Sequence, residues 1–211
     1  MAKHHTCMRR LLVVGSPGAG KTRLSGLLAD KLGLPLIHLD YYRFNPHWVP
    51  VERQHWLSLT AEIAAGPQWI IDGTWEGSFP ICMPRADTLI WLDLPRSTCL
   101  RRVMLRSLRN FGRLRPELNG CREFLPCVPQ VWSYPAKQRP NIVHKIERFG
   151  RHLSVIRLRN DHETDAFIAT LGDKPNRSPM SAVGDRSSTT RLGADMSHSP
   201  RWLRGNSFRL W

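Results

Sequence analysis

The chain has 211 residues, of which 41% are apolar, and a formal net charge of +14 with a sequence pI of about 10.6. This length suits one domain with extensions, and no apolar run approaches the roughly 20 residues that a membrane-spanning helix needs. Five scattered cysteines without a C-x-x-C pair argue against a disulfide scaffold or a zinc finger. We therefore expect a cytoplasmic protein with no membrane segment, whose charge attracts phosphate-rich small molecules, nucleic acid or anionic lipid.

The first half of the chain alternates between apolar strands and helices. A leader occupies residues 1–9, and a buried strand is expected at residues 11–14. A helix with leucines at helical spacing follows up to Leu32, and a second strand spans residues 35–39 and ends at Asp40. A loop rich in aromatic residues and prolines then precedes a helix around residues 56–63.

The second half continues the alternation. Three further strands are expected, at residues 69–71, 88–94 and around 155–156. An arginine-rich helix at about 97–111 follows the fourth strand, and Asn160 with Glu163 resembles a capping box that starts a last helix. Ser, Arg, Gly and Pro dominate residues 172–211, which we expect to be a disordered basic tail. Strands that alternate with helices predict an α/β fold, with a parallel sheet covered on both faces.

The segment between the first strand and the first helix reads G-S-P-G-A-G-K-T and fits the phosphate-loop pattern G-x-x-x-x-G-K-[ST] in full. Glycines let backbone N–H groups surround phosphate oxygens, and the following helix points its positive end at the same anion. We expect Lys21 to reach the β- and γ-phosphates of ATP and Thr22 to hold Mg²⁺ through its hydroxyl. The flanking strand and helix disfavour a chance glycine-rich turn. The predicted nucleotide-binding residues are Gly15, Ser16, Pro17, Gly18, Ala19, Gly20, Lys21 and Thr22.

Three acids stand at the carboxyl ends of predicted strands, where open parallel sheets bind their ligands. Asp72, before Gly73, is expected to be the carboxylate on the Mg²⁺ side; the alternative is a simple turn residue. Asp40 is expected to face the phosphoryl acceptor and to orient or deprotonate its hydroxyl. A capping or turn role for Asp40 stays equally open. Asp93 is interpreted as a structural turn residue.

Residues 96–115 contain seven arginines and no acid. Four of them, Arg102, Arg106, Arg109 and Arg113, share one helical face. Like charges stacked in this way repel one another, so an anion usually offsets them. A transferring phosphoryl group, contacted by Arg106 and Arg109 as catalytic residues, is one candidate. A nucleic-acid backbone is another, and a solvated basic face is the third.

Taken together, these motifs resemble the adenylate-kinase-like group of small P-loop kinases, and most of all bacterial DNA topology modulation proteins. The resemblance covers about residues 9–171. It is carried by GSPGAGKT, by LPLIHLD before an aromatic loop, by WIIDG, and by RADTLIWLDLPRSTCLRR followed by RSLRN. It implies a three-layer α/β/α fold like that of nucleoside monophosphate kinases, with a five-stranded parallel sheet. It also implies a mobile arginine-rich lid at about residues 107–125.

The resemblance also implies roles for individual residues. Arg102 is similar to the lid arginine that packs on adenine, Arg106 to the arginine that touches the transferring phosphoryl, and Arg85 to an arginine on the substrate side. Where adenylate kinases carry D-G-F-P-R, this chain has D-G-T-W-E, without the arginine that grips the phosphate of AMP. The acid at position 40 is more similar to that of kinases that phosphorylate a hydroxyl.

Three functions follow as hypotheses. The first is a kinase that transfers the γ-phosphoryl of Mg-ATP to a small-molecule or nucleotide acceptor. The second is a nucleic-acid-binding ATPase that affects DNA topology, motivated by the net charge and the arginine helix. The third is an ATP-binding module without transfer activity, against which the intact Lys21, Thr22 and Asp72 argue.

Overall fold

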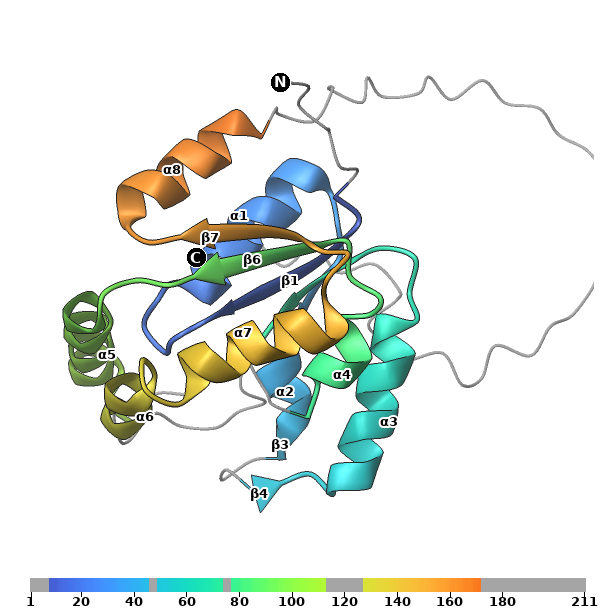
Figure 1. The fold of residues 1–211 in the computed structure, drawn as a ribbon. Coiled ribbons are helices and arrows are strands. Elements are labelled where there is room, and N and C mark those ends of the chain that lie inside the picture. Colours follow the sequence, from blue (N-terminus) through green and yellow to red (C-terminus); the bar gives the residue numbers. More distant parts are fainter. Residues whose placement is uncertain (1–7, 46–48, 74–76, 113–126, 172–211) are drawn as a thin grey trace, which may run out of the picture. The chain divides into compact units, whose positions relative to one another are not determined.

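A parallel sheet of five strands forms the centre of the fold (Figure 1). The computed structural model describes residues 8–45, 49–73, 77–112 and 127–171. The strand order is β2-β5-β1-β6-β7, and each neighbouring pair is parallel. The strands are β1 (Arg10–Gly15), β2 (Leu36–His38), β5 (Trp69–Asp72), β6 (Thr88–Leu92) and β7 (Ser154–Leu158). The predicted five-stranded parallel sheet is therefore confirmed.

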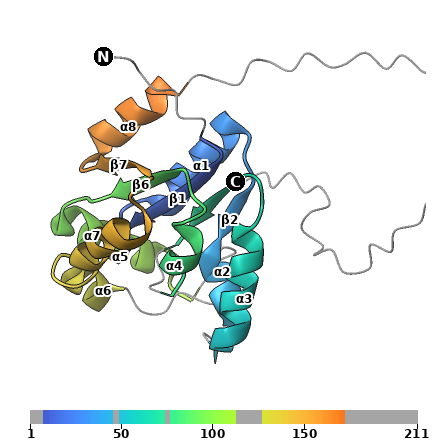
Figure 2. The ribbon, with the colours of Figure 1, turned by 45° about the vertical axis from the view of Figure 1, so that its right-hand side comes forward.

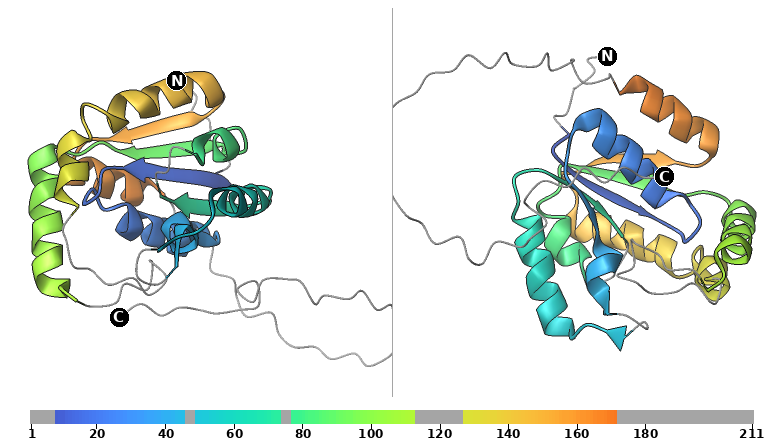
Figure 3. Two further views of the ribbon diagram at one scale, coloured as in Figure 1. Left: turned by 90° about the horizontal axis from the view of Figure 1, so that it is seen from below. Right: turned by 180° about the vertical axis from the view of Figure 1, so that it is seen from behind.

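Helices cover both faces of this sheet (Figures 1 and 3). The helices are α1 (Lys21–Leu32), α2 (Leu39–Arg43), α3 (Arg53–Ala64), α4 (Phe79–Cys82), α5 (Arg96–Asn110), α6 (Val128–Ser133), α7 (Gln138–Phe149) and α8 (Asp161–Thr170). α1 and α8 pack on one face, and α3, α4 and α7 pack on the other. This arrangement confirms the predicted three-layer α/β/α fold.

Side chains of β1 point alternately to the two faces of the sheet, and both faces are covered by helices. Leu11 and Val13 belong to the core beneath α1 and α8, whereas Leu12 and Val14 belong to the core beneath α3, α4 and α7. All four side chains are fully buried. A strand in the middle of a parallel sheet has no polar face, which is why this segment reads as a continuous apolar run.

The second strand is shorter than the sequence predicts. β2 ends at His38, and Leu39 and Asp40 already belong to α2, which lies beside α3 (Figure 2). Leu39 is fully buried and anchors this short helix to the core. The expected loop that follows contains instead the end of α2 and the antiparallel pair β3 (Phe44–Asn45) and β4 (Val49–Pro50).

The last helix begins as the capping box predicts. The side-chain oxygen of Asn160 accepts a hydrogen bond from the backbone N–H of Glu163 at 2.8 Å, and the Glu163 carboxylate accepts one from the backbone N–H of Arg159 at 2.8 Å. The first bond satisfies a donor that the first turn of a helix leaves without an intrahelical partner, and the second holds the residue before the N-cap.

Some expectations concern residues outside the described part of the chain. These are most of the leader, the lid beyond Gly112 as far as residue 125, and the tail at 172–211. Within the described ranges, each helix is too short or too polar to cross a bilayer.

The core should lose stability when a central leucine is shortened. Leu89 in β6 is fully buried, so Leu89→Ala is expected to lower the free energy of unfolding by about 2–5 kcal/mol. Leu108 in α5 is 74% exposed, and Leu108→Ala should change stability by no more than about 0.5 kcal/mol. Urea unfolding followed by circular dichroism measures both. Equal losses in the two variants would contradict this assignment of the core.

Candidate functional site

The phosphate loop leaves the sheet at the carboxyl end of its central strand. Gly15 ends β1, and α1 begins at Lys21 after Gly20, which adopts a left-handed conformation with φ 98°. The Lys21 ammonium donates hydrogen bonds to the carbonyls of Gly15 at 3.1 Å and Ser16 at 3.2 Å, so it lies across the loop. The predicted order of strand, glycine-rich loop and helix is present. The N-terminus of α1 places its unpaired N–H groups at this loop, where an anion is favoured.

α5 packs directly on the phosphate loop at Gly18. A Cβ built on this residue would lie 2.5 Å from the Cys99 carbonyl oxygen and 2.8 Å from a Val103 methyl. Gly18 also has φ 80°, which disfavours other residues. Burial raises the pKa of the Cys99 thiol, so at neutral pH the thiol packs as a neutral group. The helix that carries the arginines therefore touches the predicted phosphate cradle without a side chain between the two backbones.

Asp72 and Thr22, 50 residues apart in sequence, meet beside this loop. The Thr22 hydroxyl donates to Asp72 Oδ2 at 3.0 Å, and His38 Nδ1 lies 3.2 Å from the same oxygen. Asp72 is only 5% exposed, and its other oxygen, Oδ1, is buried without a hydrogen-bond partner among the described residues. Thr22 and Asp72 were both expected on the Mg²⁺ side, whereas His38 was not predicted.

These residues fit a magnesium ion. A buried carboxylate oxygen without a donor is costly, and a cation is one partner that offsets this cost. The Thr22 hydroxyl donates its hydrogen bond to Asp72, which leaves the lone pairs of the hydroxyl oxygen for a metal. Mg²⁺ prefers oxygen ligands and is usually held by one or two carboxylates together with substrate phosphates. Asp72 and Thr22 are thus the residues that would hold it.

Asp40 lies next to Gly73, the residue after Asp72. A Cβ built on Gly73 would be 3.4 Å from Asp40 Oδ1 and 3.1 Å from the Leu39 Cβ. Gly73 therefore allows α2 to approach the end of β5 closely. The structure brings Asp40 to the same edge of the sheet as Asp72. Asp40 stands in the first turn of α2 and not, as expected, at the end of a strand.

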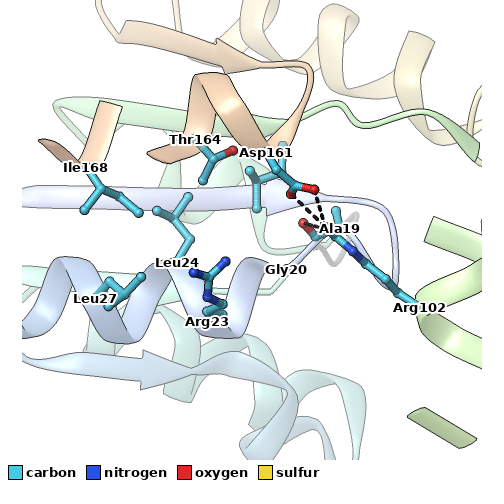
Figure 4. Close-up of a pocket in the computed structure, with 10 residues that line it drawn as sticks. Ala19, Gly20, Arg23, Leu24, Leu27, Arg102, Asp161, Thr164 and Ile168 are labelled. Atoms are coloured by element: carbon cyan, nitrogen blue, oxygen red, sulfur yellow. Dashed lines mark hydrogen bonds and ion pairs between the residues drawn. The ribbon is translucent and has the colours of Figure 1, made fainter. Parts of the chain in front are cut away.

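Arg102 lies on the other side of the phosphate loop, in a pocket between α1, α5 and α8 (Figure 4). Its guanidinium binds both oxygens of Asp161, at 2.7 and 2.6 Å, and donates to the Ala19 carbonyl at 3.5 Å. The pocket has a volume of about 240 Å³ and is lined by Ala19, Gly20, Arg23, Leu24, Leu27, Leu92, Arg102, Asp161, Thr164 and Ile168.

Two of the remaining predicted arginines lie on α5, and the third, Arg85, lies before β6. Arg106 is half-buried on α5, and Arg109 is exposed near its end. Arg85 is not brought to the site. It precedes the first residue of β6 by three positions, and neighbouring Asp87 binds the backbone N–H groups of Arg9 and Arg10 at the start of β1. Because the strands are parallel, this is the opposite edge of the sheet. The expected substrate-side role of Arg85 is corrected on that ground.

Asp93 proves to be more than a turn residue. Its side chain is 3% exposed, and it accepts hydrogen bonds from Arg139 Nε at 2.9 Å and from Arg157 Nε at 2.9 Å. The Arg157 guanidinium also lies 4.5 Å from the centre of the Trp91 ring. Asp93 therefore ties the end of β6 to α7 and β7. Arg139 is a basic residue at this edge that the sequence analysis missed, because its partner lies 46 residues earlier.

Comparison with known proteins supports the fold. No family model and no curated protein matches the chain. Among solved structures, the chain is similar to shikimate kinase from Acinetobacter baumannii in complex with shikimate, at 13% identity and a TM-score of 0.50, over 79% of this chain and 92% of that one. It is also similar to a sugar kinase from a Janibacter species, at 18% identity and a TM-score of 0.44, over 77% and 91%.

The likeness to the Acinetobacter protein establishes that the chain has the fold of a small P-loop kinase. This confirms the coarser part of the expected resemblance. The finer part, a relation to DNA topology modulation proteins, finds no counterpart in these comparisons and stays a prediction.

The contact between Gly18 and α5 gives a direct test of the phosphate loop. Gly18→Ala adds a Cβ that meets the Cys99 carbonyl, so the loop must shift and ATP affinity should fall at least about tenfold, the change that 1.4 kcal/mol of strain produces. Gly26→Ala in α1 is the matched control, because no heavy atom lies within 4 Å of the added Cβ. Gly26→Ala should keep ATP affinity and gain helix stability. Calorimetric titration with ATP measures the affinities, and unchanged binding in Gly18→Ala would contradict the assignment.

Proposed function

We propose that the chain is a phosphotransferase that passes the γ-phosphoryl of Mg-ATP to a hydroxyl of a small molecule or nucleotide. The contact between Thr22 and Asp72 carries the proposal, because it joins a hydroxyl and a buried carboxylate beside Lys21. A helix N-terminus, an ammonium and an oxygen-lined cation site then stand together at one edge of the sheet. This combination suits a nucleotide polyphosphate better than a simple anion.

The binding of ATP follows from this arrangement. The backbone N–H groups of residues 15–22 would surround the phosphates, and Lys21 would move its hydrogen bonds from the loop carbonyls to phosphate oxygens. The pocket at Arg102 would take the base. Its volume of about 240 Å³ lies below the roughly 300–1,000 Å³ of pockets that enclose a drug-sized ligand, which suits one planar ring system.

The transfer step needs the acceptor on the side of Asp40. The acceptor oxygen forms a bond to the γ-phosphorus, while the bond from that phosphorus to the bridging oxygen of ADP breaks. The hydroxyl proton passes to the Asp40 carboxylate. Bound Mg²⁺ would neutralise charge on the phosphate oxygens. Arg106 and Arg109 are proposed to stabilise the charge that spreads over the transferring group.

The acceptor is proposed to carry a hydroxyl and not to be AMP. Asp40 suits a hydroxyl, which must lose a proton, whereas a nucleotide phosphate is already ionised. The segment after Asp72 also lacks the arginine that would grip the phosphate of AMP. The similar Acinetobacter kinase, which was solved with shikimate bound, is a precedent for a small-molecule ligand.

Nucleic acid remains the competing partner, because the chain carries a net charge of +14. One arginine of the predicted basic face, Arg102, is already paired with Asp161, which reduces the charge free to contact a phosphate backbone. Duplex DNA binding that is absent at about 50 mM salt would remove this alternative, and steeply salt-dependent binding would favour it.

Lys21→Ala should remove the cation that faces the phosphates. We expect the rate of ATP-dependent phosphorylation to fall by about 10²–10³-fold, the usual loss when a preorganised charge is deleted. Lys31→Ala, at the far end of the same helix, is the control and should keep wild-type activity. ADP release is measured with a panel of nucleosides, nucleotides and small alcohols. An unchanged ATP affinity in Lys21→Ala would count against the proposal, and no ADP release with any acceptor would favour a binding module.

Asp40→Asn should affect transfer but not nucleotide binding. The amide keeps the shape of the side chain and cannot take a proton, so kcat should fall by about 10²–10⁴-fold. ATP affinity should stay unchanged, because Asp40 lies beside Gly73 and not in the phosphate loop. Steady-state kinetics with calorimetry separates the two quantities. Wild-type kcat in Asp40→Asn would leave only the capping or turn role.

A further inference from the structure

The carboxylate of Asp72 receives two donors on one oxygen and none on the other. Thr22 donates to Oδ2 at 3.0 Å and His38 Nδ1 lies 3.2 Å from it, whereas buried Oδ1 has no partner among the described residues. A carboxylate at this position rotates about its Cβ–Cγ bond unless its hydrogen bonds fix it. The two donors therefore fix the orientation of the carboxylate beside Thr22.

Sheet register explains why His38 reaches Asp72. The two residues are Cα partners at the carboxyl ends of neighbouring parallel strands β2 and β5. Alternation places Asp72 on the same face as Ile70, and His38 on the same face as Leu36. Both Ile70 and Leu36 pack in the core beneath α1, the helix that carries Thr22. The three side chains are thus directed to one point by the backbone.

An ionised carboxylate can only accept hydrogen bonds, so His38 Nδ1 carries the proton that it shares with Oδ2. The side chain of His38 is 27% exposed, compared with 6% for Asp72, so His38 lies between the buried carboxylate and solvent-accessible surface. A group that fixes a ligand in this way typically changes metal affinity by about 10–100-fold.

We propose that His38 is a positioning residue for the metal site: its Nδ1–H holds Asp72 Oδ2 and so fixes the orientation of the carboxylate beside Thr22. This inference rests on the proposed function, because it needs Mg-nucleotide at the phosphate loop. His38 itself touches neither the nucleotide nor the acceptor in this role. Its effect passes through the orientation of Asp72.

Two substitutions separate this role from simple packing. His38→Asn keeps an N–H at the position of Nδ1, whereas His38→Leu has similar bulk and no donor. His38→Gln carries its amide one bond farther out, at the position of Nε2, and serves as a second donor-displaced variant should His38→Leu not fold. His55→Leu is the matched control, because the side chain of His55 is exposed on α3, away from Asp72, and its backbone N–H binds Glu52 at the start of that helix.

The readout is the contribution of metal to nucleotide binding. Calorimetry gives the affinity of each variant for ATP with Mn²⁺ and for ATP with a chelator, and the ratio of the two affinities is the metal contribution. We expect His38→Leu to lower this ratio by about 10–100-fold and to leave metal-free ATP binding unchanged. His38→Asn should restore most of the ratio, and His55→Leu should match the wild type. Thermal unfolding checks that each variant is folded.

The outcomes distinguish the inference from the proposed function. If the wild-type protein shows a metal contribution and His38→Leu keeps it, the inference is overturned and the proposed function stands. If His38→Leu lowers ATP affinity equally with Mn²⁺ and with the chelator, the effect is packing alone and the inference is overturned. The same holds if His38→Asn does not restore the metal contribution. If the wild-type protein binds no nucleotide, the proposed function fails and the inference fails with it.

Discussion

The buried carboxylate of Asp72 is the point on which the site depends. A charge with so little access to water needs polar partners, and it finds Thr22 from the first turn of α1 and His38 from the end of β2. These partners can meet only if β2, β5 and α1 adopt their places in the sheet. The apolar strands that build the core therefore also assemble the polar site, because parallel strands end at the same edge.

The fold and the phosphate loop could be predicted because their signals are local. GSPGAGKT lies within eight residues, and each apolar strand is followed by a helix of regular period. Asp72 was expected at the binding edge for the same reason, since it ends an apolar strand, and its role toward Mg²⁺ stays a prediction. Arg85 was misplaced because its role was transferred from the resemblance alone, although it precedes a predicted strand and so stands at the amino end of the sheet.

Contacts between segments that are distant in the chain could not be predicted from the sequence. Nothing in the sequence singles out His38, and only its register with Asp72 gives it a partner. Asp93 gathers Arg139 and Arg157 across 46 and 64 residues, so its two ion pairs have no local signature. Pairings of this kind depend on tertiary packing, which neither periodicity nor spacing reports.

The arginine-rich helix meets the phosphate cradle backbone to backbone at Gly18 and Cys99. In mechanical terms, Gly18 itself has no side chain that could rearrange between the two parts. A displacement of the first turns of α5 is passed on to the loop without being absorbed by side-chain rearrangement, because packed interiors deform little. The contact at Gly18 accordingly links the loop to the first turns of α5, and any residue larger than glycine there would force the two apart.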